Sequence, residues 1–208
     1  MFYGRHTPKL NEPRTLEALS TSGDSGLFVV TRDEAKQHMR VEHTDDDSYI
    51  DTLIEAAERY CETATDRTFL TKRLQATWDG FPLEIRLPKP PVVQDAPAFV
   101  ITYKDGAQNT VVMSDSEFRA EYSDPCVLRP PYSQTWPTAL SDISSVTVSW
   151  NAGYSASHGG VPAGIKHAVL MIVGHLYERR LAFDTLSSIE VPLGVKAMLS
   201  ANAWGQYR

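Results

Sequence analysis

Cysteine is scarce in this sequence, and long apolar runs are missing. Cys61 and Cys126 are the only two cysteines among 208 residues, and their spacing does not suggest a zinc site. A secreted disulfide scaffold is normally far richer in cysteine. The longest apolar run, residues 168–174, falls well short of the ~20 residues that cross a bilayer. We therefore expect a soluble protein, made in the cytosol with reduced thiols and with no membrane partner.

Basic residues are also too few for a general nucleic-acid binder. The chain carries 20 Lys and Arg against 26 Asp and Glu, a net charge of −6. A protein that binds nucleic acid broadly through its phosphates needs an excess of positive charge. Aromatic residues gather in the middle of the chain, where they could stack on bases, but Arg and Lys do not alternate with them. Core and interface packing accounts for them better.

Motifs for catalysis, metals and cofactors are missing too. The acidic run 45–47 lacks the alternating ligands, the glycine and the distant glutamate of a calcium loop. His167 and His175 share a predicted helix but lack the pairing of a zinc-binding helix. Gly159 and Gly160 lack the lysine and hydroxyl of a phosphate loop, and no nucleophile elbow exists. We expect no catalytic residue, no cofactor and no metal, and hence no enzyme.

The first third of the chain predicts an arm followed by two helices. Residues 1–26 mix proline and glycine with polar residues and show neither a helical nor a strand period, so we expect an extended arm. Thr31 and Glu34 match a capping box, which predicts a helix over residues 31–40. An amphipathic helix is predicted over residues 46–66, because apolar residues recur there at three- and four-residue intervals: Ile50, Leu53, Ile54, Ala57, Cys61 and Ala64.

The middle of the chain, about residues 68–152, predicts β-structure. Apolar and polar residues alternate with a period of two, as over residues 74–78. Turn signals at residues 79–80, 87–91 and 104–106 divide the segment, because proline removes a ladder donor and glycine permits positive φ. We expect several short antiparallel strands.

Helical spacing returns towards the end of the chain. It predicts helices over residues 162–180 and 192–201, and the first is apolar nearly all round, so we expect it to be buried on more than one side. Residues 200–208 remain as a C-terminal tail. The predicted fold class is α+β, mainly α. It is a small helical bundle in one domain, residues 27–199, with an inserted antiparallel β section.

Several stretches stand in a fixed order that resembles a known family. They are TRDEAKQHMRV from Thr31, DTLIEAAERYCETATDRTF, Trp78, Phe81-Pro82, IRLPKPPV, ITYKDG, Trp136-Pro137, VTVSWNAGY, VPAGIKHAVLMIVGHLYERR and VPLGVKAML. Together they resemble the head-to-tail connector, or adaptor, family of tailed bacteriophages, also labelled phage head-tail connector or DNA packaging protein. The resemblance spans about Leu27 to Leu199. Residues 1–26 and the final SANAWGQYR depart from the family pattern.

The resemblance implies a structural protein of the virion neck, with no reaction and no cofactor. It implies a ring, usually of twelve copies, that stacks under the portal protein and presents a platform to the stopper or tail-completion protein. Packaged DNA would pass through the channel of the ring, and the protein would be assembled in the host cytoplasm. On this interpretation, residues 27–199 are the connector domain.

Interface residues can be nominated by residue type. A closed ring of identical subunits needs a heterologous interface, and aromatic and Arg side chains dominate interface hot spots. We expect Trp136 and Tyr154 to contact partners, and Trp204, Tyr207 and Arg208 to anchor on the portal. Because the chain is net acidic, we expect an acidic or mixed lumen through which DNA passes without specific binding.

Two other classes of protein compete with this interpretation. A phage DNA-packaging or DNA-binding factor is suggested by the first two helices, which together resemble a helix-turn-helix. However, the second helix carries Glu55, Glu58 and Glu62 where a recognition helix needs Arg, Lys, Asn or Gln. A small hydrolase needs a nucleophile, a base and an orienting group, and the sequence shows no such set at a recognisable spacing.

Overall fold

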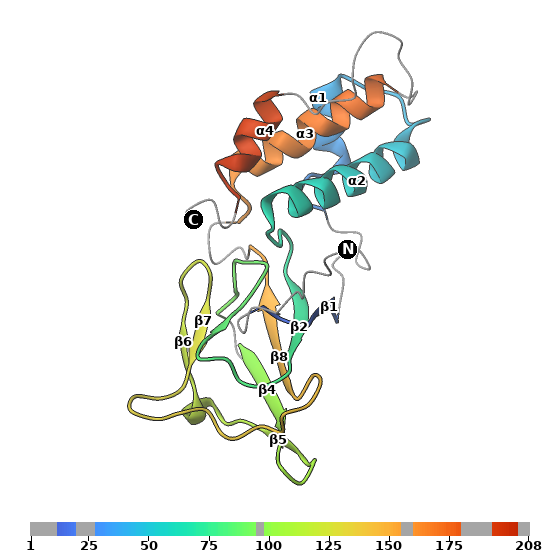
Figure 1. The fold of residues 1–208 in the computed structure, drawn as a ribbon. Helices are drawn as coiled ribbons and strands as arrows, with labels where there is room; N and C mark the ends of the chain where they lie inside the picture. Colours follow the sequence, from blue (N-terminus) through green and yellow to red (C-terminus); the bar gives the residue numbers. More distant parts are fainter. Residues whose placement is uncertain (1–11, 20–27, 95–97, 155–159, 180–192, 204–208) are drawn as a thin grey trace, which may run out of the picture. The chain divides into compact units, whose positions relative to one another are not determined.

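The computed structural model describes residues 12–19, 28–94, 98–154, 160–179 and 193–203. Contacts within the chain divide it into two units, which we call the β unit and the helical unit (Figure 1). The β unit contains residues 1–21 and 72–152, and the helical unit contains residues 22–71 and 153–208. Each unit has a hydrophobic core of its own.

The described part of the helical unit contains four helices. They are α1 (Arg32–Met39), α2 (Asp47–Thr65), α3 (Ala163–Glu178) and α4 (Leu193–Ser200). Each helix lies inside the range that the sequence predicts for it. Helix α3 packs against α1, α2 and α4, which explains why its sequence is apolar nearly all round (Figure 1).

The capping box predicted at the start of α1 is present. The Glu34 N–H donates to Thr31 Oγ1 at 3.2 Å, and the Thr31 N–H donates to the Glu34 carboxylate at 2.7 Å. The bonds from the Thr31 backbone and hydroxyl lower the pKa of Glu34. Helix α1 ends at Arg40, which has φ 57°, and Lys36 joins α1 to the start of α2 through an ion pair with Asp47 at 2.7 Å.

Helices α2 and α3 supply most of the helical core. Ile50 and Ile54 of α2 are fully buried, at the spacing that predicted the helix. Cys61 is a free thiol inside this core, where burial raises its pKa to about 12. The buried cluster comprises Val29, Val30, Ala35, Ile50, Leu53, Ile54, Ala57, Cys61, Phe69, Ile165, Ala168, Val169, Ile172, Val173, Val195 and Leu199.

The described part of the β unit contains two antiparallel sheets. The first has the order β1-β2-β8-β4-β5 and the second the order β3-β7-β6 (Figure 1). The five strands of the first sheet are β1 (Thr15–Ala18), β2 (Lys72–Trp78), β8 (Val146–Ala152), β4 (Phe99–Lys104) and β5 (Thr110–Val112). The strands of the second are β3 (Ile85–Arg86), β7 (Val127–Arg129) and β6 (Arg119–Glu121).

Both sheets contribute to one core in the β unit. Strands β2 and β8 are paired so that Leu74 faces Trp150 and Trp78 faces Val146, and all four side chains are buried. Leu128 of the second sheet is buried in the same cluster. The alternation seen in the sequence therefore marks the inward face of the first sheet.

Strands take a larger share of the fold than the sequence analysis expected. The architecture is α+β, with four helices and two antiparallel sheets among the described residues, and helices do not clearly predominate. The prediction of a mainly α fold is not supported. It treated the β section as a detour from a helical bundle, whereas the two sheets bury enough apolar surface against each other to form a core of their own.

The described part of the predicted N-terminal arm, residues 12–19, contains strand β1. It pairs antiparallel with β2, from Thr15 opposite Thr77 to Ala18 opposite Leu74. All four residues of β1 are exposed, which explains why no alternating apolar pattern marks this strand in the sequence.

Two of the passages of the chain between the units, after Thr71 and after Ala152, lie at adjoining positions. Strand β2 begins at Lys72 and β8 ends at Ala152, and these two residues are paired. Gly153 follows with φ 131°, and a Cβ at this position would lie 2.6 Å from backbone atoms of Leu70 and Thr71. Only glycine adopts this conformation readily and leaves room for so close an approach.

Candidate assembly surface

Leu83 and Tyr132 are the large hydrophobic side chains with the greatest exposure in the described part of the chain. Leu83 is 88% exposed and Tyr132 is 83% exposed. Both line the same open hollow of about 440 Å³ in the β unit, beside the strands of the second sheet. Large side chains exposed together in this way are typical of an interaction site. We call the residues around this hollow the Leu83/Tyr132 surface.

Tyr132 is held in its exposed position by neighbouring groups. The guanidinium carbon of Arg119 lies 4.9 Å from the centre of the Tyr132 ring, in a cation–π contact. Arg119 Nε also donates to the carbonyl of Pro130 at 3.0 Å. Pro130 and Pro131 restrict the backbone that leads to Tyr132. The aromatic ring is therefore presented to solvent beside a cationic side chain.

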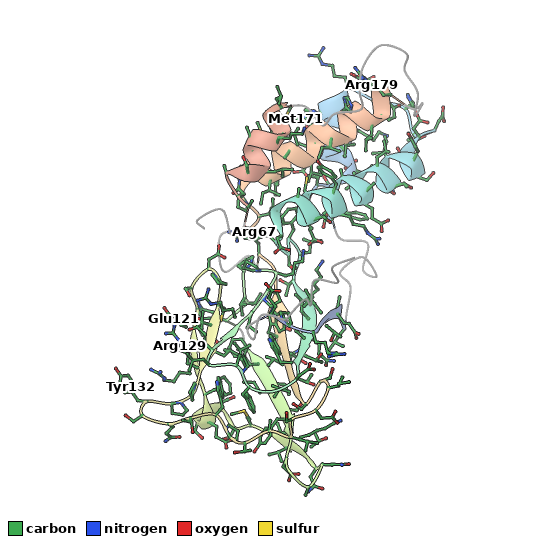
Figure 2. The ribbon with its side chains drawn as sticks, viewed as in Figure 1. Arg67, Glu121, Arg129, Tyr132, Met171 and Arg179 are labelled. Carbon is green, nitrogen blue, oxygen red and sulfur yellow. The ribbon has the colours of Figure 1, made fainter. Side chains whose placement is uncertain are left out.

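Charged groups on the second sheet frame the hollow. Arg129 forms ion pairs with Glu84 at 2.9 Å and with Glu121 at 3.2 Å, and Arg86 pairs with Glu84 at 2.7 Å. Bonds from Arg129 first and Arg86 second lower the pKa of Glu84, because they favour its ionised form. Figure 2 shows Arg129, Glu121 and Tyr132 on the same side of the β unit. An apolar centre with a charged rim is the usual build of a protein–protein interface.

A second open hollow, of about 460 Å³, also has Leu83 in its lining. Trp136 lines this hollow and stacks on Phe81, with ring centres 5.0 Å apart and planes inclined by 10°. Its indole N–H donates to the carbonyl of Leu83 at 3.3 Å. Residues 81–83 and 130–141 thus form two neighbouring hollows that share Leu83.

Two of the nominated interface residues, Trp136 and Tyr154, belong to different units. Trp136 lies in the β unit at the second hollow. Tyr154 belongs to the helical unit, where it packs against the helical core and its N–H donates to the carbonyl of Phe69 at 2.9 Å. The remaining three nominated residues, Trp204, Tyr207 and Arg208, lie outside the described residues.

Sequence reasoning did not single out Leu83 or Tyr132 as interface residues. Tyr132 carried a signal, because an aromatic residue directly after two prolines sits on a restricted backbone. Leu83 carried no such signal, since a single leucine beside Phe81-Pro82 is as compatible with a core position as with an exposed one.

Neither a membrane span nor a metal cluster is present in the described ranges. No described helix combines the length and the apolar character that a membrane crossing needs. Within those same residues, His, Cys, Asp and Glu side chains do not gather in groups of three or more that could hold a metal ion.

A known protein family matches part of this chain. Residues 31–102 match the Phage gp6-like head-tail connector protein family. The match confirms the resemblance drawn from the sequence, and it covers α1, α2, β2, β3 and most of β4. The family is one of structural connector proteins, in agreement with the expectation that the chain is not an enzyme. A search of the curated proteins found no match.

Solved structures of similar fold come from gene transfer agent (GTA) particles. A chain from "Neck of empty GTA particle computed with C6 symmetry" matches with a TM-score of 0.71 and 17% identity, over 91% of this chain and 95% of that chain. A chain from "Neck of native GTA particle computed with C12 symmetry" matches with a TM-score of 0.68 and 18% identity, over 91% and 94%. At these identities the similarity shows a shared fold.

Proposed function

We propose that this chain is a structural subunit of the neck of a phage-like particle. In this role it forms a ring that joins the portal to the stopper or tail and continues the DNA channel. Two observations carry the proposal. The family match over residues 31–102 names head-tail connectors, and the fold match over 91% of the chain leads independently to neck proteins.

Ring formation is supported by the symmetry of the neck structures and by the surface of this chain. The similar chains come from necks computed with C6 and C12 symmetry, so a ring of twelve copies fits both. In a closed ring, one face of each subunit fits a different face of its neighbour. We assign the Leu83/Tyr132 surface, which includes an exposed Tyr and Arg119, to one side of such a contact.

DNA passage through the ring is supported by the charge of the chain. A net charge of −6 favours repulsion of phosphates over their retention. We expect an acidic or mixed lumen, and a strongly basic lumen in a solved ring would contradict this expectation.

The alternative of a DNA-binding factor finds little support in α2. Glu58 is buried and accepts from the Val29 N–H at 2.9 Å, and Glu62 accepts from the Phe69 N–H at 2.7 Å. Glu55 pairs with the exposed Arg59 at 2.6 Å. These acidic residues stabilise the helical unit, and Arg59 is the only Arg, Lys, Asn or Gln in α2, so the helix lacks the side chains that a recognition helix uses to contact bases.

The mass of the purified chain, alone and with portal rings, tests the proposal. We expect species near twelve times the mass of the 23.2 kDa chain, and co-migration with the portal.

A double variant, Leu83→Ser with Tyr132→Ser, should lose ring assembly while its unfolding midpoint stays close to that of the wild type, because both side chains are exposed. Val112→Ser, at a residue 64% exposed on β5, is the matched control and should assemble normally. Assembly of the double variant at the wild-type level would remove the Leu83/Tyr132 surface from the interface.

The predicted portal anchor needs a truncation placed with care. Arg67 Nε donates to the carbonyl of Asn202 at 2.5 Å, and Asn202 Nδ2 donates to the carbonyl of Met198 at 2.9 Å. Removal of residues 200–208 would break these bonds, so the informative truncation removes residues 204–208. We expect this variant to unfold like the wild type and to bind portal rings more weakly. Unchanged binding would reject Trp204, Tyr207 and Arg208 as the anchor.

A further inference from the structure

The outer edge of strand β2 is paired with β1, the first strand of the sheet. Strand β1 contacts it mainly through backbone and polar groups. The Arg14 N–H donates to the Thr77 carbonyl at 2.7 Å, and the Leu19 N–H donates to the Arg73 carbonyl at 2.8 Å. The hydroxyls of Thr15 and Thr77 are 2.8 Å apart. A strand bound in this way is recognised by its backbone, as in the addition of a peptide to a sheet edge.

The β unit does not depend on β1 for its core. Among the described residues, the buried cluster of this unit and the side chains packed against it include no member of β1. Leu16 is 37% exposed and Leu19 is 54% exposed, so the strand buries little apolar surface. The occupant of the β2 edge can therefore leave without opening the hydrophobic core.

The β unit itself orients the polar groups of this edge. The Ser144 N–H donates to Asp79 at 2.9 Å, and the Ser144 hydroxyl lies 3.2 Å from the Thr77 hydroxyl. Asp79 is thereby positioned to receive Arg14, with which it forms an ion pair at 2.9 Å. Any chain that carries the sequence of residues 14–19 meets the same prepared groups.

We propose that, in the assembled ring, the β2 edge of each subunit binds residues 12–19 of a neighbouring copy of this chain. The proposal rests on the proposed function, since it requires a ring. A single chain offers β1 only its own edge, whereas a ring offers an identical edge on the next copy. The contacts are the same in both cases, so their exchange between identical subunits needs no new recognition.

The exchange requires that the β2 edge of the next copy lie within reach of the connection between β1 and the helical unit. Residues 20–27 link β1 to the helical unit, and eight residues span at most about 28 Å. Each subunit would give one strand and receive one, which is the head-to-tail pattern that closes a ring. Where the next edge lies within this span, the fixed separation of neighbours in a ring gives the strand a high effective concentration at that edge.

Engineered disulfides distinguish exchange from pairing within one chain. The 2.8 Å separation of the Thr15 and Thr77 hydroxyls places sulfurs at these positions within reach of each other. Cys61 and Cys126 are fully buried and should not compete. Size-tagged Thr15→Cys chains are co-assembled with untagged Thr77→Cys chains, and the ring fraction and the monomer fraction are oxidised separately. Thr15→Cys chains co-assembled with Val112→Cys chains, whose cysteine is at the opposite edge of the sheet, are the control.

With equal amounts of the two chains, exchange predicts a tagged–untagged disulfide dimer in up to about half of the chains of the ring fraction, because only about half of the tagged chains precede an untagged one. It predicts little dimer in the monomer fraction and none in the control. The double variant, Thr15→Cys with Thr77→Cys, should give a ladder of linked subunits in rings and a closed loop within each chain in monomers. Rings in which the double variant forms only loops within single chains would overturn the exchange and leave the proposed function intact. If wild-type chains form no ring, alone or with portal, the proposed function fails and the exchange fails with it.

Discussion

Replacement of Gly153 by alanine should destabilise the protein strongly, for two independent reasons. With φ 131°, the backbone of Gly153 has a conformation that an L-residue with a side chain rarely adopts. A Cβ would also lie 2.6 Å from the carbonyl carbon and oxygen of Leu70 and from the nitrogen of Thr71. These are backbone atoms, so no side-chain rotation relieves the clash, and one of the two chain segments must move.

The size of the effect follows from these two costs. Holding a residue with a side chain in a sparsely populated backbone region costs roughly 1–3 kcal/mol. Displacing packed backbone to admit a methyl group costs roughly another 1–3 kcal/mol. We expect a loss of about 4 kcal/mol in the free energy of unfolding. For a chain of this size, each kcal/mol lowers the melting temperature by about 2–4 °C, so the melting temperature should fall by about 12 °C.

Urea unfolding followed by circular dichroism, together with calorimetry, measures the effect. Gly106→Ala is the matched control, because a Cβ at Gly106 meets nothing within 4 Å and its φ lies outside the positive region. That variant should stay within about 0.5 kcal/mol of the wild type. If the free energies of unfolding of Gly153→Ala and Gly106→Ala differ by less than about 1 kcal/mol, the close approach of backbone at Gly153 is wrong.

Two further changes test local features. Thr31→Ala removes the N-cap of α1 and should lower the free energy of unfolding in urea by about 1 kcal/mol. Thr52→Ala removes an exposed hydroxyl inside α2 and should lower it by less. Equal losses would contradict the cap. Glu84→Gln should lower stability at pH 7 by on the order of 1 kcal/mol, because the folded state holds the pKa of Glu84 below its ordinary 4.5. This contribution exists above the ordinary pKa and disappears as the pH falls through the folded pKa. Melting curves of the two proteins should therefore converge as the pH drops below 4.5, and a constant gap would refute the ion pairs.

The helices were predictable because each leaves a local signal. Thr31 and Glu34, three residues apart, match a capping box, and the buried positions of α2 repeat at helical spacing. The alternation over β2 likewise reflects one buried face. In each case the signal arises from burial of one side of a regular element.

The individual strands of the second sheet and strand β1 were not predictable, because neither shows a visible burial pattern in the sequence. Strand β3 has two residues and strands β6 and β7 have three each, too short for a period to be visible. Strand β1 is exposed on both sides, so its sequence carries no burial pattern. Its position depends on backbone pairing and on Arg14 with Asp79, which are far apart in the sequence.

The candidate surface was predictable only in part. Trp136 was nominated as a large aromatic residue, and it does line a hollow, although one of its faces is stacked on Phe81. The exposure of Leu83 is a property of the folded surface, since the same residue type most often lies inside. Whether Leu83 and Tyr132 share a hollow depends on how residues 81–83 and 130–134 fold back together.

The adjoining passages at Thr71 and Gly153 bear on how this molecule can change over evolution. The segment between them leaves and returns at neighbouring points, so it can lengthen, shorten or be exchanged while the ends of α2 and α3 stay where they are. Insertions at such a site are tolerated because they impose no new distance on the host fold. A lineage could therefore adapt to a new neighbour by changing this segment, together with the β1 residues that pair with it, while the four helices stay unaltered.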